Sequence, residues 1–82
     1  MTNSDNWTEA NGALTKRFTF ADFAEAFAFL TRVAAHAEKV DHHPEFTSRW
    51  NKVDFRLTSH DAGGVTERDV ALARVIDSLA SR

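Results

Sequence analysis

The chain contains no cysteine, so it can form no disulfide and offers no thiolate as nucleophile or metal ligand. It also has little net charge: 10 lysines and arginines stand against 12 acidic residues, and the formal net charge is −2. Nucleic-acid binders usually gather basic residues on one surface. Here acidic residues interrupt the basic ones throughout, so we expect no direct nucleic-acid partner. The longest weakly polar stretch, 23–37, is too short and too charged to cross a membrane.

A length of 82 residues predicts one domain over residues 1–82. A chain this short buries only about 60–65% of the surface that its unfolded form exposes. Small domains with a modest core often gain stability by association, so we expect a homo-oligomer. The first six residues are polar and acidic and do not resemble a targeting peptide. Together with the absence of cysteine, they favour a cytoplasmic location.

The first predicted element is a hairpin. Asn11-Gly12 is a strong signal for a two-residue turn, because such a turn needs residues that tolerate a positive φ. This turn predicts two short strands, over residues 7–10 and 13–18.

A long helix is predicted next, over residues 20–39. Thr19 and Asp22 have the spacing of a capping box, and Phe18 and Phe23 have that of the hydrophobic pair that packs around such a cap. Apolar residues then recur at steps of three and four, which predicts one buried stripe. Its members are Phe20, Phe23, Phe27, Leu30, Ala34 and Ala37.

A second helix is predicted to begin after Thr66. Thr66 has the position of the cap, Asp69 follows three residues later, and Val65 and Val70 have the spacing of the hydrophobic pair. The Gly63-Gly64 pair ahead of it predicts a flexible loop. The apolar positions of this helix are Val70, Ala73, Ile76 and Leu79.

Between the helices, Asn51-Lys52 predicts a hairpin of the strands 45–50 and 53–59. If these two residues form the turn, one face of the hairpin is almost wholly apolar, with the pairs Trp50/Val53, Ser48/Phe55 and Phe46/Leu57. The other face is wholly polar, with the pairs Arg49/Asp54, Thr47/Arg56 and Glu45/Thr58. This separation is typical of an antiparallel hairpin that buries one face.

The same register predicts a cluster of histidines. Two pairs further along it, His43 lies opposite His60, where paired Cβ atoms are roughly 4.5–5.5 Å apart. His42 lies beside them, and Pro44 restricts His43 to an extended backbone. His36, inside the long helix, has no partner by this reasoning and should be an ordinary surface residue.

Three interpretations of the cluster are open. The histidines could be solvated residues at strand ends. They could bind zinc, since three imidazoles and a water form a known catalytic site, but adjacent residues of an extended chain point to opposite sides, which disfavours shared ligation by His42 and His43. Finally, imidazole titrates at about pH 6.5, so one histidine can donate a proton while another accepts one. We expect this third role, general acid–base catalysis, with no metal and no other cofactor.

Several motifs resemble those of the pterin-4a-carbinolamine dehydratases. The likeness covers nearly the whole chain and includes Trp7, ahead of the first hairpin. The motifs are Glu38-Lys-Val-Asp41-His42-His43-Pro44-Glu45, Trp50-Asn51-Lys52-Val53, Thr58-Ser-His60-Asp61 and Gly64-Val-Thr-Glu-Arg-Asp69.

This resemblance implies a lyase that removes water from a 4a-hydroxytetrahydropterin to give a quinonoid dihydropterin, as in tetrahydrobiopterin biosynthesis and recycling. It also implies an α+β fold, with a four-stranded antiparallel sheet and helices packed on one face. Relatives associate as homodimers or dimers of dimers. Vertebrate relatives also act as dimerisation partners of a homeodomain transcription factor. A protein-binding role without turnover is therefore the alternative function.

By resemblance, His42, His43 and His60 are the catalytic and substrate-binding histidines. Four further residues match the family and are candidates for substrate binding, each with a structural alternative. Asp69 could simply cap the second helix, and Trp7 could belong to the core. Glu38 and Asp41 could each orient an imidazole or be solvated charges at the end of a helix.

Overall fold

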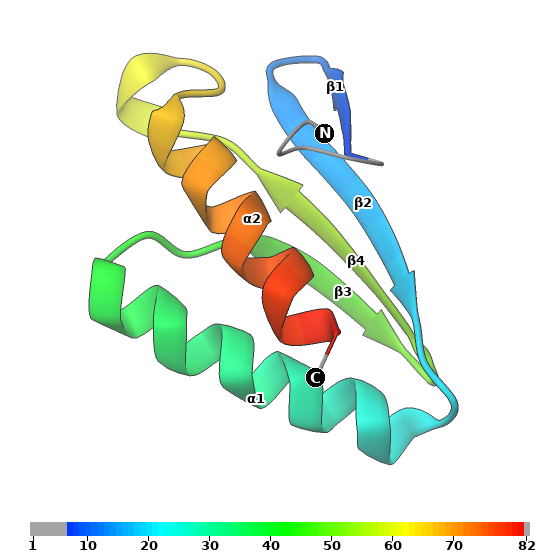
Figure 1. Ribbon diagram of the computed structural model, residues 1–82. Helices are drawn as coiled ribbons and strands as arrows, with labels where there is room; N and C mark the ends of the chain where they lie inside the picture. Colours follow the sequence, from blue (N-terminus) through cyan, green and yellow to red (C-terminus); the bar gives the residue numbers. More distant parts are fainter. Residues whose placement is uncertain (1–6, 82) are drawn as a thin grey trace.

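The computed structural model describes residues 7–81 (Figure 1). Residues 1–6 and 82 lie outside the described residues. The prediction that the first six residues are not a targeting peptide therefore stays a prediction. The sheet has the strand order β1-β2-β4-β3. The elements are β1 (Thr8–Ala10), β2 (Ala13–Thr19), α1 (Phe23–Val40), β3 (Glu45–Arg49), β4 (Lys52–Leu57), the 3-10 turn η1 (His60–Ala62) and α2 (Glu67–Ala80).

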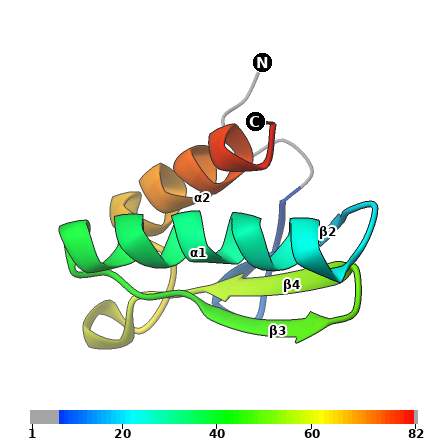
Figure 2. The ribbon, with the colours of Figure 1, turned by 90° about the horizontal axis from the view of Figure 1, so that it is seen from below.

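The chain forms two layers. All neighbouring strands are antiparallel, and both helices cover the same face of the sheet (Figure 2). The predicted α+β class, with four antiparallel strands and helices on one face, is confirmed. The core lies between the layers, and its largest fully buried apolar side chains are Phe29, Phe55, Leu57, Ile76, Val33 and Val53. No helix of residues 7–81 is long and apolar enough to cross a membrane.

The first hairpin and the second helix follow their sequence signals. Asn11 and Gly12 have φ values of 54° and 75°, and they join β1 to β2 as a two-residue turn. Thr66 caps α2, and the reciprocal bonds of a capping box with Asp69 are both present. Within α2, Leu72 is buried in addition to Ala73 and Ile76.

Helix α1 begins three residues later than predicted, and it buries a different face. Asp22, instead of Thr19, is the cap, and its carboxylate accepts a hydrogen bond from the backbone N–H of Glu25 at 2.9 Å. Phe23 is therefore half exposed instead of packing around the cap with Phe18. Only Leu30 and Ala37 of the predicted stripe are buried, and the observed stripe is Ala26, Phe29, Leu30, Val33 and Ala37.

The predicted register of the second hairpin is wrong. Its turn residues are Trp50 and Asn51, so Arg49 pairs with Lys52, and each β3 residue pairs two positions earlier on β4 than predicted. A shift of two residues keeps every strand side chain on its predicted face. Trp50 is the exception: it leaves the apolar face, occupies the turn with φ 51° and is exposed.

Two hydrogen bonds account for this turn. The side chain of Asn51 donates through Nδ2 to the carbonyl oxygen of Phe20 at 2.9 Å. The backbone N–H of Phe20 donates to the carbonyl oxygen of Asn51 at 2.8 Å. The segment between β2 and α1 therefore holds Asn51 in place, and this contact between distant residues overrides the local turn preference.

Candidate active site

Three segments that are far apart in the sequence meet at one end of the molecule. These are the C-terminal end of α1, the loop after β4 and the N-terminal end of α2 (Figures 1 and 2). Between them is a pocket of about 310 Å³, a size at the lower end of small-molecule sites. We call it the histidine pocket. It is lined by Asp41, His42, His43, Thr58, Ser59, His60, Asp61 and Arg68.

The structure therefore brings His42, His43 and His60 together, although not by the predicted route. The β3–β4 ladder ends at the pair Glu45–Arg56, so His43 and His60 lie beyond it and are not a cross-strand pair. His42 and His43 come from the segment between α1 and β3, and His60 comes from η1, after β4.

The end of α1 places His42. Asp41 follows the last helical residue and has φ 54°, in the left-handed region, which ends the helix and reverses the chain. The backbone N–H of His42 donates to the carbonyl oxygen of Ala37 at 3.2 Å. As a result the His42 side chain is directed towards α2 and is only 9% exposed.

Asp69 is the main partner of His42. Its Oδ1 lies 2.7 Å from His42 Nε2, and Asp69 is fully buried. Its Oδ2 accepts hydrogen bonds from the backbone N–H of Thr66 at 2.9 Å and from the Ser59 hydroxyl at 2.8 Å. Asp69 therefore caps α2 with one oxygen and holds a histidine with the other.

These contacts also set the charge of Asp69. Burial is the largest single influence on its pKa and acts to raise it. The hydrogen bonds from the Thr66 backbone, His42 and Ser59 together outweigh burial, so the pKa of Asp69 is lowered from its ordinary value. Asp69 is thus an ionised hydrogen-bond acceptor inside the fold at neutral pH.

The other two histidines are more exposed. His43 Nε2 lies 2.6 Å from Oε2 of Glu38, one turn back along the chain, and both side chains are largely in solvent. His60 begins the 3-10 turn η1. Gly63, with φ 73°, closes that turn, and Ser59 and Gly64 form a small antiparallel bridge behind it. These contacts fix the loop that presents His60.

Trp7 lies apart from the histidine pocket. Its ring is buried in the core beside Phe18 and Phe55, and its indole N–H donates to the carboxylate of Asp77. Of the four predicted substrate-binding residues, Asp41 lines the pocket, Glu38 holds His43, Asp69 holds His42, and Trp7 contacts none of the three histidines among the interactions of the described residues.

Sequence reasoning missed Arg68 and Ser59. Arg68 Nη2 lies 3.2 Å from His42 Nδ1, on the ring edge away from Asp69. A signal for Arg68 was present, because a cation in the first turn of a helix opposes the helix dipole and calls for another explanation. His36, predicted to be an ordinary surface residue, is partly buried and lines an apolar cleft next to His42.

Among residues 7–81, no group of three or more histidine, cysteine, aspartate or glutamate side chains is arranged to hold a metal ion. His42 is committed to Asp69 and His43 to Glu38. Acid–base chemistry without a metal therefore stays the prediction for this site.

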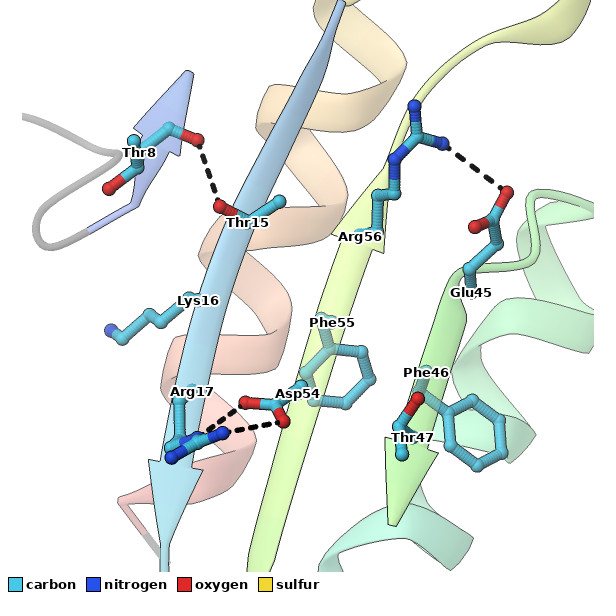
Figure 3. A pocket seen from close by; sticks show the side chains of 10 residues that line it. All are labelled: Thr8, Thr15, Lys16, Arg17, Glu45, Phe46, Thr47, Asp54, Phe55 and Arg56. Carbon is cyan, nitrogen blue, oxygen red and sulfur yellow. Dashed lines mark hydrogen bonds and ion pairs between the residues drawn. The ribbon is translucent and has the colours of Figure 1, made fainter. Parts of the chain in front are cut away.

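A larger hollow of about 590 Å³ lies on the open face of the sheet (Figure 3). Its charged side chains are paired: Arg17 binds Asp54 at 2.7 Å, and Arg56 binds Glu45 at 3.4 Å. The hydrogen bond from Arg17 lowers the pKa of Asp54. The described residues that line this hollow include no histidine. The histidine pocket is therefore the better candidate for chemistry.

Comparison with known proteins identifies the family of the chain. The family model described as Pterin 4 alpha carbinolamine dehydratase matches residues 1–79. The chain belongs to this family. Relatives named "Putative pterin-4-alpha-carbinolamine dehydratase" include proteins of Rhizorhabdus wittichii and Burkholderia cenocepacia. The first is 55% identical over 92% of this chain and 77% of the relative, and the second is 51% identical over 93% and 76%.

Two solved structures have folds similar to that of this chain. One is the transcriptional coactivator/pterin dehydratase of Brucella melitensis, with a TM-score of 0.90 and 42% identity over 93% of this chain and 83% of that one. The other is a pterin dehydratase-like protein identified as a RuBisCO assembly factor in the alpha-carboxysome. It has a TM-score of 0.80 and 29% identity over 96% and 94% of the two chains.

Proposed function

We propose that the protein dehydrates a 4a-hydroxytetrahydropterin to the quinonoid dihydropterin by general acid–base catalysis. The observation that carries this proposal is the convergence of His42, His43 and His60 on one pocket in a chain of the pterin-4a-carbinolamine dehydratase family. The activity would serve tetrahydrobiopterin recycling.

The reaction needs two proton transfers. An acid gives a proton to the hydroxyl on C4a, and the C4a–O bond breaks to release water. A base takes the proton from N5, and the electron pair of that N–H bond forms the C4a–N5 double bond. Imidazolium and neutral imidazole suit these two steps near neutral pH, and the balance needs neither a metal nor a redox cofactor.

The carboxylates around the pocket have distinct parts in this proposal. Glu38 and Asp69 each accept a hydrogen bond from one imidazole and so orient His43 and His42. Asp41 lines the pocket, where it can accept hydrogen bonds from the N–H groups of a pterin. Trp7 is buried in the core, so we assign it to the support of the fold and not to substrate binding.

A direct test follows quinonoid dihydropterin formation by ultraviolet absorbance. Single replacement of His42, His43 or His60 with alanine should lower the rate by about 10²–10⁴-fold where the residue transfers a proton, and less where it only binds. His36→Ala, outside the histidine pocket, is the matched control and should keep most of the rate. Three cluster variants with unchanged rates would refute the proposal. So would stoichiometric zinc in the active protein with activity lost to a chelator.

A protein-binding function without turnover is the second candidate. Of the two similar structures, one is of a transcriptional coactivator/pterin dehydratase and the other is of a RuBisCO assembly factor, which favours a binding role as the second candidate. Scaffolding alone requires none of the three histidines. A purely binding protein would leave the 4a-hydroxypterin to dehydrate at its spontaneous rate, so the same assay separates the two functions.

We further propose that the protein acts in the cytoplasm as a homodimer or a dimer of dimers. Support for association comes from large apolar side chains that are about half exposed or more in the single chain. These are Phe23, Phe27, Val40, Phe46 and Trp50. Light scattering on the purified full chain should give a mass of two or four chains.

A further inference from the structure

The ring of His42 is contacted on both of its nitrogens by α2. Nε2 lies 2.7 Å from Asp69 Oδ1, and Nδ1 lies 3.2 Å from Arg68 Nη2. The two partners are consecutive residues at the start of one helix. His42 therefore sits between an acidic and a basic side chain that a single element positions together.

The chemistry of these partners decides where the ring proton lies. A guanidinium group has only donors, so Arg68 can hydrogen-bond to Nδ1 only if that nitrogen carries no proton. A neutral imidazole with an unprotonated Nδ1 carries its proton on Nε2. The ionised carboxylate of Asp69 is the acceptor for that Nε2–H. Both contacts are satisfied at once in one form of the ring, the neutral Nε2–H tautomer.

The place of Arg68 on α2 argues against a purely structural role. It is the second residue of the helix, where a positive charge is unfavourable to the helix dipole. Its side chain is 53% exposed. Its backbone N–H bonds to the Thr66 hydroxyl whatever the side chain is. The side chain is thus available to act on His42.

Resting on the proposed function, we infer that Arg68 is a positioning residue that, opposite Asp69, holds His42 as the neutral Nε2–H tautomer at the wall of the histidine pocket. The lone pair of Nδ1 is then shared with the Arg68 guanidinium, so His42 carries no proton at Nδ1 and can accept one there only when the contact with Arg68 lengthens.

Other charged and titratable groups surround this trio. Asp61, from η1, lies 3.8 Å from Arg68 Nη1 and partly neutralises the guanidinium. The pockets that His42 lines also contain His36 from α1, Asp41 and His43 from the segment after it, and His60 from η1. Of the groups named here, only Asp69 and Arg68 form hydrogen bonds with the His42 ring.

The test uses ¹⁵N-labelled full chain and long-range ¹H–¹⁵N spectra of the imidazole rings, with the His42 signals assigned by their loss in His42→Ala. At neutral pH, the wild type should show a protonated Nε2 and an unprotonated Nδ1. Arg68→Met removes the donors and should give His42 a population that is protonated on Nδ1. Arg68→Lys keeps a cation with donors and should restore most of the wild-type signature. Arg74→Met, an exposed position on the same helix, is the control and should leave the ring unchanged.

Turnover adds a second readout. In Arg68→Met the acidic side of the rate–pH profile should move to higher pH, and the thermal unfolding midpoint should stay near that of Arg74→Met. A doubly protonated His42 in the wild type, or identical ring spectra in wild type and Arg68→Met, would overturn the inference even if turnover is intact. Wild-type protein without turnover but with the expected spectra would sink the dehydratase proposal and leave the tautomer assignment supported.

Discussion

At the scale of single residues, Asp69 combines two functions that sequence reasoning treats as alternatives. One oxygen completes the cap of α2, and the other holds His42. The capping-box spacing in the sequence predicted the first role, and resemblance to the family suggested a role in the site. No local pattern shows that the two roles share one buried carboxylate, because the second contact joins residues 27 positions apart.

Two variants separate these roles. Thr66→Ala removes only the cap hydroxyl and should lower the free energy of unfolding by about 0.5–2 kcal/mol with little change in rate. Asp69→Asn puts an amide N–H against either His42 or the donors of the cap. It should lower the free energy of unfolding by about 1–3 kcal/mol and the rate by about 10²-fold or more. Urea unfolding and the dehydration assay measure the two effects, and equal rates in both variants would mean that Asp69 only caps.

At the scale of elements, the sequence predicted the helices, the strands and the two faces of the second hairpin, but it did not predict all boundaries. The predicted burial of Phe46 and Ser48 is wrong, because β3 is exposed along its whole length. The hairpin faces survive because a shift of two residues preserves alternation. The register itself depends on the bonds between Asn51 and Phe20, which no local preference encodes. In α1, phenylalanines occur on two faces, so periodicity alone could not choose between the stripe through Phe27 and the one through Phe29.

The turn of the second hairpin lets us test the conflict between these long-range hydrogen bonds and the local backbone preference of Trp50. Trp50 has φ 51° and is exposed, and a left-handed conformation is unfavourable for such a side chain. Trp50→Asn should raise the free energy of unfolding by about 0.5–1 kcal/mol, since asparagine tolerates this conformation. Thr47→Asn, at an exposed position within β3, should lower the free energy of unfolding instead, because asparagine is unfavourable in a strand. Denaturant unfolding checks both, and a destabilised Trp50→Asn would contradict this account of the turn.

At the scale of the whole molecule, the two ends of the layered fold differ in what stabilises them. The end with the β3–β4 turn is locked by backbone and amide hydrogen bonds between Asn51 and Phe20. The end with the histidine pocket depends on an ionised, fully buried carboxylate. The stability of the end that holds the candidate site therefore depends on the protonation of Asp69. The sequence predicted that histidines meet at this end, and resemblance named Asp69 as a site residue, but neither predicted that its carboxylate is fully buried beneath them.

This dependence predicts how the folded chain responds to acid. The pKa of Asp69 is lowered in the folded state, whereas an unfolded aspartate titrates at about pH 4. The folded chain thus binds this proton less readily, so the contribution of Asp69 is fully present above about pH 4 and is lost as pH falls through the lower folded value. Asp54 acts in the same direction, but the side chains of Arg17 and Asp54 are 50% and 38% exposed, so solvent screens the pair and it should contribute little.

Urea unfolding of the wild type and of Asp69→Asn at pH 7, 5 and 3 measures the contribution. The two proteins should differ by the same free energy at pH 7 and pH 5, because Asp69 is ionised in both states of the chain there. The difference should shrink at pH 3, because there the unfolded aspartate is mostly protonated, so the ionised carboxylate that accepts from His42, Ser59 and Thr66 in the folded chain stabilises the fold less. Asp54→Asn is the matched control and should track the wild type closely throughout. A difference that stays constant down to pH 3 would mean that the charge of Asp69 does not stabilise this end of the fold.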